Sequence, residues 1–301
     1  MKKILALLLI LTMLPLAGCG CSLGQDTGKI KVVATLFPQY DFARHIGGNK
    51  VEVTLLLPPG TESHHYDPSP SDMVSIAESR LFIYTGDMME GWAGDIASSV
   101  GDSVTILDAS RGITLSAADL SHDHDHALDP HIWLDFDKAA KMCDNIAEEL
   151  IAASPEDEAY FRANLENYKK KLATLDAEYA ATFAQKPSKD LVFGGRFALG
   201  YLVDKYSIPH RSAYDSCSAN DEPSPQTIAA LSDYVRDNDV KVVYCEEFSD
   251  PKVAREIAKA NNAEVLVLHS AHNLSKDERD KGVTFISIME QNLENIRKGL
   301  E

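Results

Sequence analysis

The sequence is short of positive charge. It has 29 lysines and arginines against 46 aspartates and glutamates, which gives a formal net charge of −17 at pH 7 over 301 residues. A chain this acidic is repelled by phosphate backbones, so nucleic acid is not expected as a partner. Hydrophobic residues still make up 45% of the chain, which indicates a folded protein with a large core rather than a disordered one.

Cysteine and long apolar stretches are also scarce. Two of the five cysteines, Cys19 and Cys21, lie near the N-terminus, and the other three are Cys143, Cys217 and Cys245. An odd number leaves at least one thiol without a disulfide partner in the chain. Cys143 and Cys245 fall in helix-like and strand-like patterns and are expected in the core, whereas Cys217 lies in a polar loop. After the N-terminal region no stretch approaches the ~20 apolar residues that a membrane-spanning helix needs.

The first residues have the pattern of a secretion signal. Lys2 and Lys3 precede an apolar run over residues 4–11, and the small residues before Cys19 in "LPLAGC" resemble a bacterial lipobox. We expect cleavage before Cys19, lipid on its thiol and a short tether over residues 20–29. An ordinary signal peptide with an unrelated cysteine is the alternative. With the lipid, the mature protein is anchored outside the cytoplasmic membrane and does not span it.

Short apolar runs alternate with helical patterns along the rest of the chain. This alternation predicts an α/β fold with two Rossmann-like lobes, residues 30–152 and 188–301, each with a mainly parallel sheet. The strands are expected at residues 30–36, 51–57, 81–86, 104–108, 191–195, 210–214, 240–245 and 264–268.

One long helix is predicted between the lobes, within residues 153–187. Ser154 suits the N-cap and Pro155 the first helical position, and Lys186-Pro187 ends the pattern. At 1.5 Å per residue the helix would span roughly 45 Å, join the lobes rigidly and allow little rotation on binding. Its apolar residues recur every three or four positions, at Phe161, Leu165, Tyr168, Leu172, Leu175, Tyr179 and Phe183.

The two halves also resemble each other. "DPSPSD" at residues 67–72 and "EPSPQT" at 222–227 each precede a helix and then a strand. Ser69 and Ser224 are expected as N-caps of these helices. In open α/β sheets, ligands bind beyond the carboxyl ends of the strands, so the loop before each helix is predicted to face a cleft between the lobes.

Histidines gather in three groups near predicted loops. Eight of the ten lie at 64–65, 122–131 and 269–272. Neutral imidazole is a strong ligand for zinc and neighbouring metals. Ligands that come from distant loops favour a bound ion over a structural zinc finger, in which they come in close pairs.

The individual histidines differ in how well they suit a metal. His131, in "DPHIWLD", is a candidate ligand, with a satisfied buried histidine as the alternative. His269 is the first residue after a strand, and His272 is a candidate ligand or a partner of one. The His- and Asp-rich stretch 121–129 is interpreted as a loop that attracts metal, or as a merely solvated one.

These motifs carry a family resemblance. "PPGTESHHYDPSPSD" (58–72), "DPHIWLD" (129–135), the long helix and "VTFISIMEQNLENIRKGL" (283–300) together resemble the zinc/manganese solute-binding lipoproteins of bacterial metal ABC importers. The resemblance covers nearly the whole chain after Cys19. It implies metal-ligand roles for His64, His131 and His269. It also implies an ABC permease and its ATPase as partners, and we expect a monomer.

One position departs from the family pattern. The family usually has a His or Glu ligand where this chain has Arg196, in "GGRFALGY", and arginine does not lose its proton in proteins. Either water completes the site or another residue does. Cys217 is the preferred substitute, because its loop is expected opposite the His64 loop and a nearby cation lowers a thiol pKa. Glu222 and Glu247 are the alternatives.

Three histidines and a thiolate favour Zn²⁺ over Mn²⁺, which prefers carboxylate-rich sites. The sequence therefore predicts a binding protein that captures Zn²⁺ and not an enzyme. A secreted hydrolase and a surface adhesin are the alternative functions. A secreted zinc hydrolase would need a general base, such as Glu222 or Glu247, and the His-Glu-x-x-His motif is absent. A surface adhesin would carry the metal as a structural element.

Overall fold

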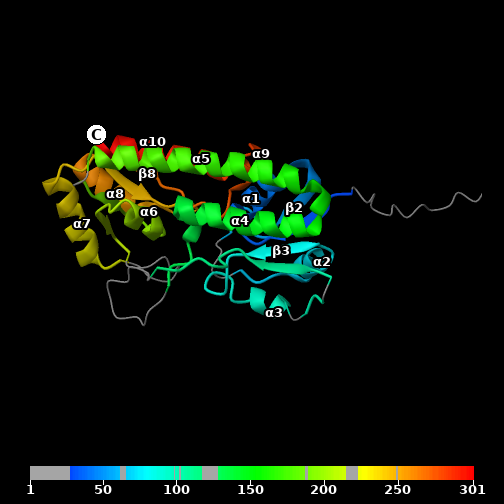
Figure 1. Ribbon diagram of the computed structural model, residues 1–301. Helices are drawn as coiled ribbons and strands as arrows, with labels where there is room; N and C mark the ends of the chain where they lie inside the picture. Colours follow the sequence, from blue (N-terminus) through cyan, green and yellow to red (C-terminus); the bar gives the residue numbers. More distant parts are fainter. Residues whose placement is uncertain are drawn as a thin grey trace, which may run out of the picture.

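Two four-stranded parallel sheets, one in each half of the chain, form the framework of the protein (Figure 1). The computed structural model describes residues 28–61, 66–97, 99–101, 103–116, 128–186, 189–214, 223–248 and 250–301. The strand order is β2-β1-β3-β4 in the first sheet and β6-β5-β7-β8 in the second, so each lobe repeats the same order of chain positions. This common topology accords with the internal similarity of the two halves.

All eight predicted strands are present. The first sheet contains β1 (Ile30–Ala34), β2 (Val51–Leu55), β3 (Leu81–Tyr84) and β4 (Thr105–Asp108). The second contains β5 (Leu191–Phe193), β6 (His210–Ser212), β7 (Val242–Cys245) and β8 (Glu264–Val267). β1 and β3, and likewise β5 and β7, are the central strands, and they are buried because helices cover the sheets.

The helices follow the α/β alternation. Those of the first half are α1 (Phe37–Gly47), α2 (Pro70–Ala77), α3 (Ala93–Ala97) and α4 (Phe136–Ala153). Those after the long helix are α6 (Gly200–Lys205), α7 (Pro225–Asp237), α8 (Lys252–Asn261), α9 (Lys276–Asp280) and α10 (Phe285–Leu300). Short 3₁₀ turns occur at Gly48–Lys50, Ile132–Leu134 and Pro155–Asp157.

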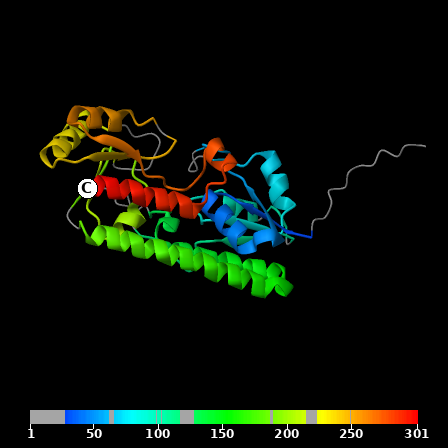
Figure 2. The same cartoon turned by 90° about the horizontal axis from the view of Figure 1, so that it is seen from above.

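The predicted long helix is α5 (Glu158–Ala184), entered through the 3₁₀ turn at Pro155–Asp157. All seven apolar residues of the predicted stripe are buried. Figure 2 shows α5 running the length of the molecule, beside both lobes, with α10 next to it. The Tyr179 hydroxyl donates to the Met289 carbonyl oxygen at 2.7 Å, which fixes α10 against α5.

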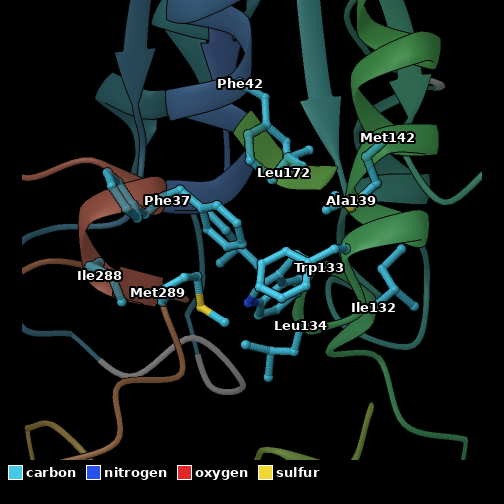
Figure 3. Packing of buried hydrophobic residues seen from close by; sticks show 14 of the residues in the cluster. Phe37, Phe42, Ile132, Trp133, Leu134, Ala139, Met142, Leu172, Ile288 and Met289 are labelled. Carbon is cyan, nitrogen blue, oxygen red and sulfur yellow. The ribbon is translucent and has the colours of Figure 1, made fainter. Parts of the chain in front are cut away.

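One hydrophobic core extends through the junction of the two lobes. Trp133 lies at its centre, fully buried, among Phe37, Leu134 and Met289 (Figure 3). These residues come from α1, from the turn before α4 and from α10. Because full burial of one large apolar side chain contributes about 2–3 kcal/mol, such packing makes the junction a stable part of the fold rather than an open hinge.

A buried carboxylate ties three helices together at this junction. Asp41 of α1 is fully buried, and its Oδ2 accepts from the Tyr168 hydroxyl of α5 and from the Phe285 amide at the start of α10, both at 3.1 Å. The helix N-terminus favours a negative charge at this place. Asp41 therefore links the first lobe to both helices that run along the second.

The two matched helices begin as predicted. The Ser69 hydroxyl accepts from the Asp72 amide at the start of α2, and the Ser224 hydroxyl accepts from the Thr227 amide at the start of α7. Each cap satisfies an amide that would otherwise lack a partner in the first helical turn. Both loops are thereby fixed at the ends that lead into their helices.

Two other expectations concern the core and the membrane. Cys143 and Cys245 are buried free thiols, as predicted. No helix among the described residues combines the length and the apolar character needed to cross a membrane. The signal segment, Cys19 and the tether up to residue 27 lie outside the described residues.

Glu90 is the most buried acid near the carboxyl ends of β1 and β3, with 1% of its surface exposed. Its carboxylate accepts from the Thr35 hydroxyl and from the Thr85 amide. Burial raises the pKa of Glu90 from 4.5 to about 7, although these hydrogen bonds act in the opposite direction. A buried carboxyl group therefore titrates near neutral pH inside the first lobe.

Replacing Glu90 by glutamine should flatten the pH dependence of stability. Because the pKa is higher in the folded state, Glu90 stabilises the fold fully below its unfolded pKa of 4.5 and loses this effect as pH rises through about 7. The loss amounts to about 3 kcal/mol. Urea unfolding at roughly pH 5 and pH 8 measures it, and Glu90→Gln should lose less free energy between these pH values than wild type. Equal losses in both proteins would contradict the assignment.

Candidate metal centre

Two of the three loops with predicted ligands meet beside the central tryptophan. The Trp133 indole Nε1–H donates to the Ser270 carbonyl oxygen at 2.7 Å. This bond joins the segment that contains His131 to the segment between β8 and α9 that contains His269 and His272. The buried indole N–H and the loop carbonyl satisfy each other, so the two segments are held in fixed register.

The loop after β2 is fastened to the same segment. The Asn273 side-chain amide donates to the carbonyl oxygens of Pro58 and Thr61, at 2.7 and 2.9 Å, and the Gly60 amide donates to the Leu274 carbonyl oxygen at 2.9 Å. Thr61 is the last described residue before the predicted ligand His64. The three loops therefore converge at the junction of the lobes, although they are far apart in the sequence.

His131 is oriented by an acid of its own loop. It is 4% exposed, and the Oδ1 of Asp129 lies 2.7 Å from its Nδ1 and 2.9 Å from its backbone nitrogen. If Nδ1–H donates to Asp129, Nε2 is the ring nitrogen able to bind a metal, and a carboxylate on the other nitrogen makes imidazole a better ligand. The ring also packs edge-on against Trp133, at 5.4 Å between centroids.

His272 has the same arrangement. Its Nδ1 lies 2.5 Å from the Ser270 hydroxyl and 3.2 Å from Oε1 of Glu247, while the Ser270 hydroxyl donates to Glu247 at 2.6 Å. These contacts place the proton on Nδ1 and the lone pair on Nε2. Among the described residues, this Nε2 is buried and has no hydrogen-bond partner. A buried lone pair of this kind is suited to a cation.

His269 presents its ring differently. Its Nδ1 accepts the Ala271 amide at 2.8 Å, so a neutral ring carries its proton on Nε2, which faces Oε1 of Glu278 at 3.6 Å. The Asn292 side chain of α10 holds the backbone of His269 by two hydrogen bonds of 2.8 Å. Among the described residues the buried Nε2 of His269 has no hydrogen-bond partner, as in His272, but in a neutral ring it carries the proton rather than a lone pair. The ligand role predicted for His269 stays a prediction, and the hydrogen bonds favour His272.

Two carboxylates near these histidines are ionised. Burial by itself would raise the pKa of Glu247, but the charge of His269 and the contacts with His272 and Ser270 outweigh it and lower the pKa well below its usual range. The neighbouring His269 ring lowers the pKa of Glu278 to about 2. Both oxygens of Glu247 accept from Ser270, which suits a residue that supports a ligand better than a ligand itself.

Several predicted site residues lie outside the described residues. They are His64, Cys217 and Glu222. Residues 121–127 of the His- and Asp-rich stretch also lie outside the described residues. Within the part of the chain that the structure describes, no three His, Cys, Asp or Glu side chains form a group able to hold a metal ion.

Arg196 lies in the loop after β5, at the carboxyl edge of the second sheet. Its Nη1 is 3.8 Å from Oε1 of Glu246, and both side chains are largely buried. An arginine adds positive charge at this edge of the sheet, and the carboxylate of Glu246 offsets that charge.

Four residues with clear roles here were not identified from the sequence. Asp129, Ser270 and Asn273 support the histidines or their loops, and Tyr201 contacts Asp129. Asp129 and Ser270 leave a local signal, because each lies two residues before a histidine and reaches its Nδ1. Asn273 and Tyr201 act across long sequence separations.

Comparisons with known proteins agree on one family. The family model for the periplasmic zinc-uptake complex component A matches residues 32–299. The chain is 34% identical over 299 residues to the high-affinity zinc uptake system protein ZnuA of Bacillus subtilis, covering 94% of this chain and 93% of that protein. It is 33% identical over 289 residues to the zinc-binding protein AdcA of Streptococcus pyogenes, covering 90% of this chain but only 56% of that longer protein.

Solved structures give the same result. The metal-dependent lipoprotein YcdH of Bacillus subtilis superposes with a TM-score of 0.79 at 34% identity, covering 90% of this chain and 99% of that one. The Zn(II)-bound ZnuA-like domain of Streptococcus pneumoniae AdcA gives 0.77 at 28% identity, with 91% and 99% covered. The laminin-binding protein Lmb of Streptococcus agalactiae, described as having adhesin and metal-transporting activity, gives 0.78 at 26% identity, with 90% and 100% covered.

Asn273→Ala should release the loop after β2 from the rest of the centre. The variant removes the two hydrogen bonds to the carbonyl oxygens of Pro58 and Thr61, so the free energy of unfolding should fall by about 2 kcal/mol. Hydrogen exchange of the Gly60 amide should become faster. Asn238→Ala is the matched control, because its amide bonds only the Tyr234 carbonyl oxygen at an exposed helix end. Unchanged exchange at Gly60 would contradict the role of Asn273.

Proposed function

Because the chain belongs to the periplasmic zinc-uptake component A family, we propose that it captures Zn²⁺ outside the cytoplasmic membrane and delivers it to the permease of an ABC importer. Zn²⁺ is the transported ligand and not a catalytic cofactor. The protein is a solute-binding component and not an enzyme, so the hydrolase alternative falls away. Transport is likewise favoured over a purely adhesive role.

One observation carries the proposal from this chain's own residues. His131 and His272 lie on loops that meet at Trp133, and each has its Nδ1 against a group that accepts a proton. A buried imidazole whose Nδ1 is held by such a group presents Nε2 as its metal-binding nitrogen, which supports both residues as zinc ligands. His64, whose loop Asn273 and Gly60 fasten to the same place, is the third proposed ligand. His269 is the alternative to His272.

The fourth position is proposed for Cys217, with Glu222 or water as alternatives. A thiolate with three imidazoles makes a tetrahedral site of the kind that zinc prefers and manganese does not. Glu247 is the weaker rival, because both of its oxygens already accept hydrogen bonds from Ser270. Arg196 keeps its proton and cannot bind a cation.

The remaining assignments concern the whole protein. We propose a lipid anchor at Cys19, a tether over residues 20–29, lobes over 30–152 and 188–301, and the linking helix within 153–187. Family membership implies a permease and its ATPase as partners. A monomer held at the outer face of the membrane would meet the permease by diffusion in two dimensions.

Alanine substitutions should separate the ligands from the supporting histidines. His131→Ala and His272→Ala should each weaken zinc binding by about 100-fold or more, because each removes a ligand rather than an outer partner. His269→Ala should weaken it by less than about tenfold. Competition with a chromogenic chelator measures the affinities, and His45→Ala is the control, because His45 bonds Asp41 inside α1. If His269→Ala lost as much affinity as His131→Ala, His269 would replace His272 as the ligand.

Cys217→Ser should weaken zinc binding by roughly tenfold or more and reduce the preference for Zn²⁺ over Mn²⁺, because the hydroxyl is a harder and poorer ligand than the thiolate. Metal content and competitive affinity of residues 22–301 provide the measurement. Cys245→Ser, which changes a buried thiol in β7, is the control. Zinc affinity equal to wild type would leave water or Glu222 in the fourth position. Preference for Mn²⁺ in the wild type would overturn the proposed function.

A further inference from the structure

Helix α6 follows a strand of the second sheet, but it contacts the segment that contains His131. The Tyr201 hydroxyl donates to the Asp129 carbonyl oxygen and accepts from the Ser116 amide, both at 2.9 Å. Tyr201 is 3% exposed, so both bonds are shielded from water. One hydroxyl therefore fixes the backbone of Asp129, the acid that orients His131.

The start of α6 also lies against the side chain of Asp129. A Cβ atom added to Gly200 would lie 2.6 Å from Oδ2 of Asp129, closer than real Cβ atoms come to any neighbour. The other oxygen of this carboxylate, Oδ1, is the one that bonds His131. The absence of a side chain at Gly200 thus allows the helix to confine the carboxylate in the position that His131 uses.

The last residue of α6 holds the other side of the same segment. Nζ of Lys205 lies 3.0 Å from Asp135, 2.6 Å from Asp137 and 3.5 Å from Asp176 of α5. Asp135 is the N-cap of α4 and accepts the Asp137 amide. Burial alone would raise the pKa of Asp135, but the contacts with Lys205 outweigh it and lower the pKa. His131 thus lies between two anchoring points on one helix.

We propose that Tyr201 is a positioning residue for the metal ligand His131. It acts through Asp129, whose backbone it holds while Gly200 confines the carboxylate, and it does not touch the metal. The inference rests on the proposed zinc function. A ring held from both sides loses little freedom when it binds an ion, so its orientation is established before the metal arrives.

Through this role of Tyr201, both lobes contribute to the geometry of the proposed site. His131 belongs to the first half of the chain, but its orientation depends on a helix of the second half. Any displacement of α6 relative to α4 would act on Asp129 first and on the imidazole next. Zinc affinity is therefore coupled to the contact between α6 and the segment 129–137, without any rotation of whole lobes.

The test compares Tyr201→Phe with Tyr206→Phe. Tyr206 lies just after α6, and its hydroxyl donates to Asp176 at 2.6 Å without contact to Asp129, so it is a matched control for losing one partly buried hydroxyl. Tyr201→Phe should weaken zinc binding by roughly tenfold, and Tyr206→Phe should leave it unchanged. With Co²⁺ in place of Zn²⁺, the visible absorption bands report ligand geometry. They should shift in Tyr201→Phe only, whereas a purely structural role would leave them unaltered.

Gly200→Ala keeps the hydroxyl and displaces the Asp129 carboxylate. Alanine also favours the helix more than glycine, so this variant should fold even if Tyr201→Phe does not. It should likewise weaken zinc binding and shift the Co²⁺ bands. Wild-type affinity and spectrum in both Tyr201→Phe and Gly200→Ala, or in Gly200→Ala alone if the other does not fold, would overturn the inference. A wild-type protein that binds no zinc would instead refute the proposed function.

Discussion

Residues 270–274 leave the second sheet and are held by the first half of the chain, mostly through their backbone. Trp133 donates a hydrogen bond to the Ser270 carbonyl oxygen. The Phe37 amide at the start of α1 donates to the His272 carbonyl oxygen at 3.0 Å. The Asn273 side chain donates two hydrogen bonds to the loop after β2. These bonds add to the core around Trp133 and to the contacts of Asp41, which also join the two halves. With them, loops from both halves meet at one place, and everything proposed about the metal depends on that meeting.

The same segment shows how a small set of polar contacts can determine chemical roles. His269 and His272 are three residues apart and equally suited to bind metal by residue type. They differ because the Ala271 amide donates to the Nδ1 of His269, whereas the Ser270 hydroxyl lies at the Nδ1 of His272; Glu247 is close to both nitrogens, at 3.4 and 3.2 Å. One ring therefore keeps its proton on Nε2, and the other keeps a lone pair there. The backbone at Ala271, with φ of +60°, is the turn that separates them.

Much of the fold was predictable because its signals are local. The stripe on α5, the eight strands and the serine caps of α2 and α7 depend on residues a few positions apart, and all are confirmed. The 3₁₀ turn that precedes α5 was not predicted. For the site, the motif DPHIWLD singled out His131, but the choice between His269 and His272 depends on how Ser270 and Ala271 contact the two rings, and the role of Tyr201 depends on Asp129, 72 positions away. No periodicity in the sequence reports contacts of that range.

The long separations have a consequence for the order of events during folding. The bond between Asn273 and Pro58 joins residues 215 positions apart, and the bond between Phe285 and Asp41 joins residues 244 apart. Closing such long loops costs entropy and is slow. The contact offsets that cost only when the local structure at both of its ends has formed. An ion that met a partly folded chain would find scattered imidazoles and no cavity. From this topology we expect the affinity for metal to appear only after the long-range contacts have formed.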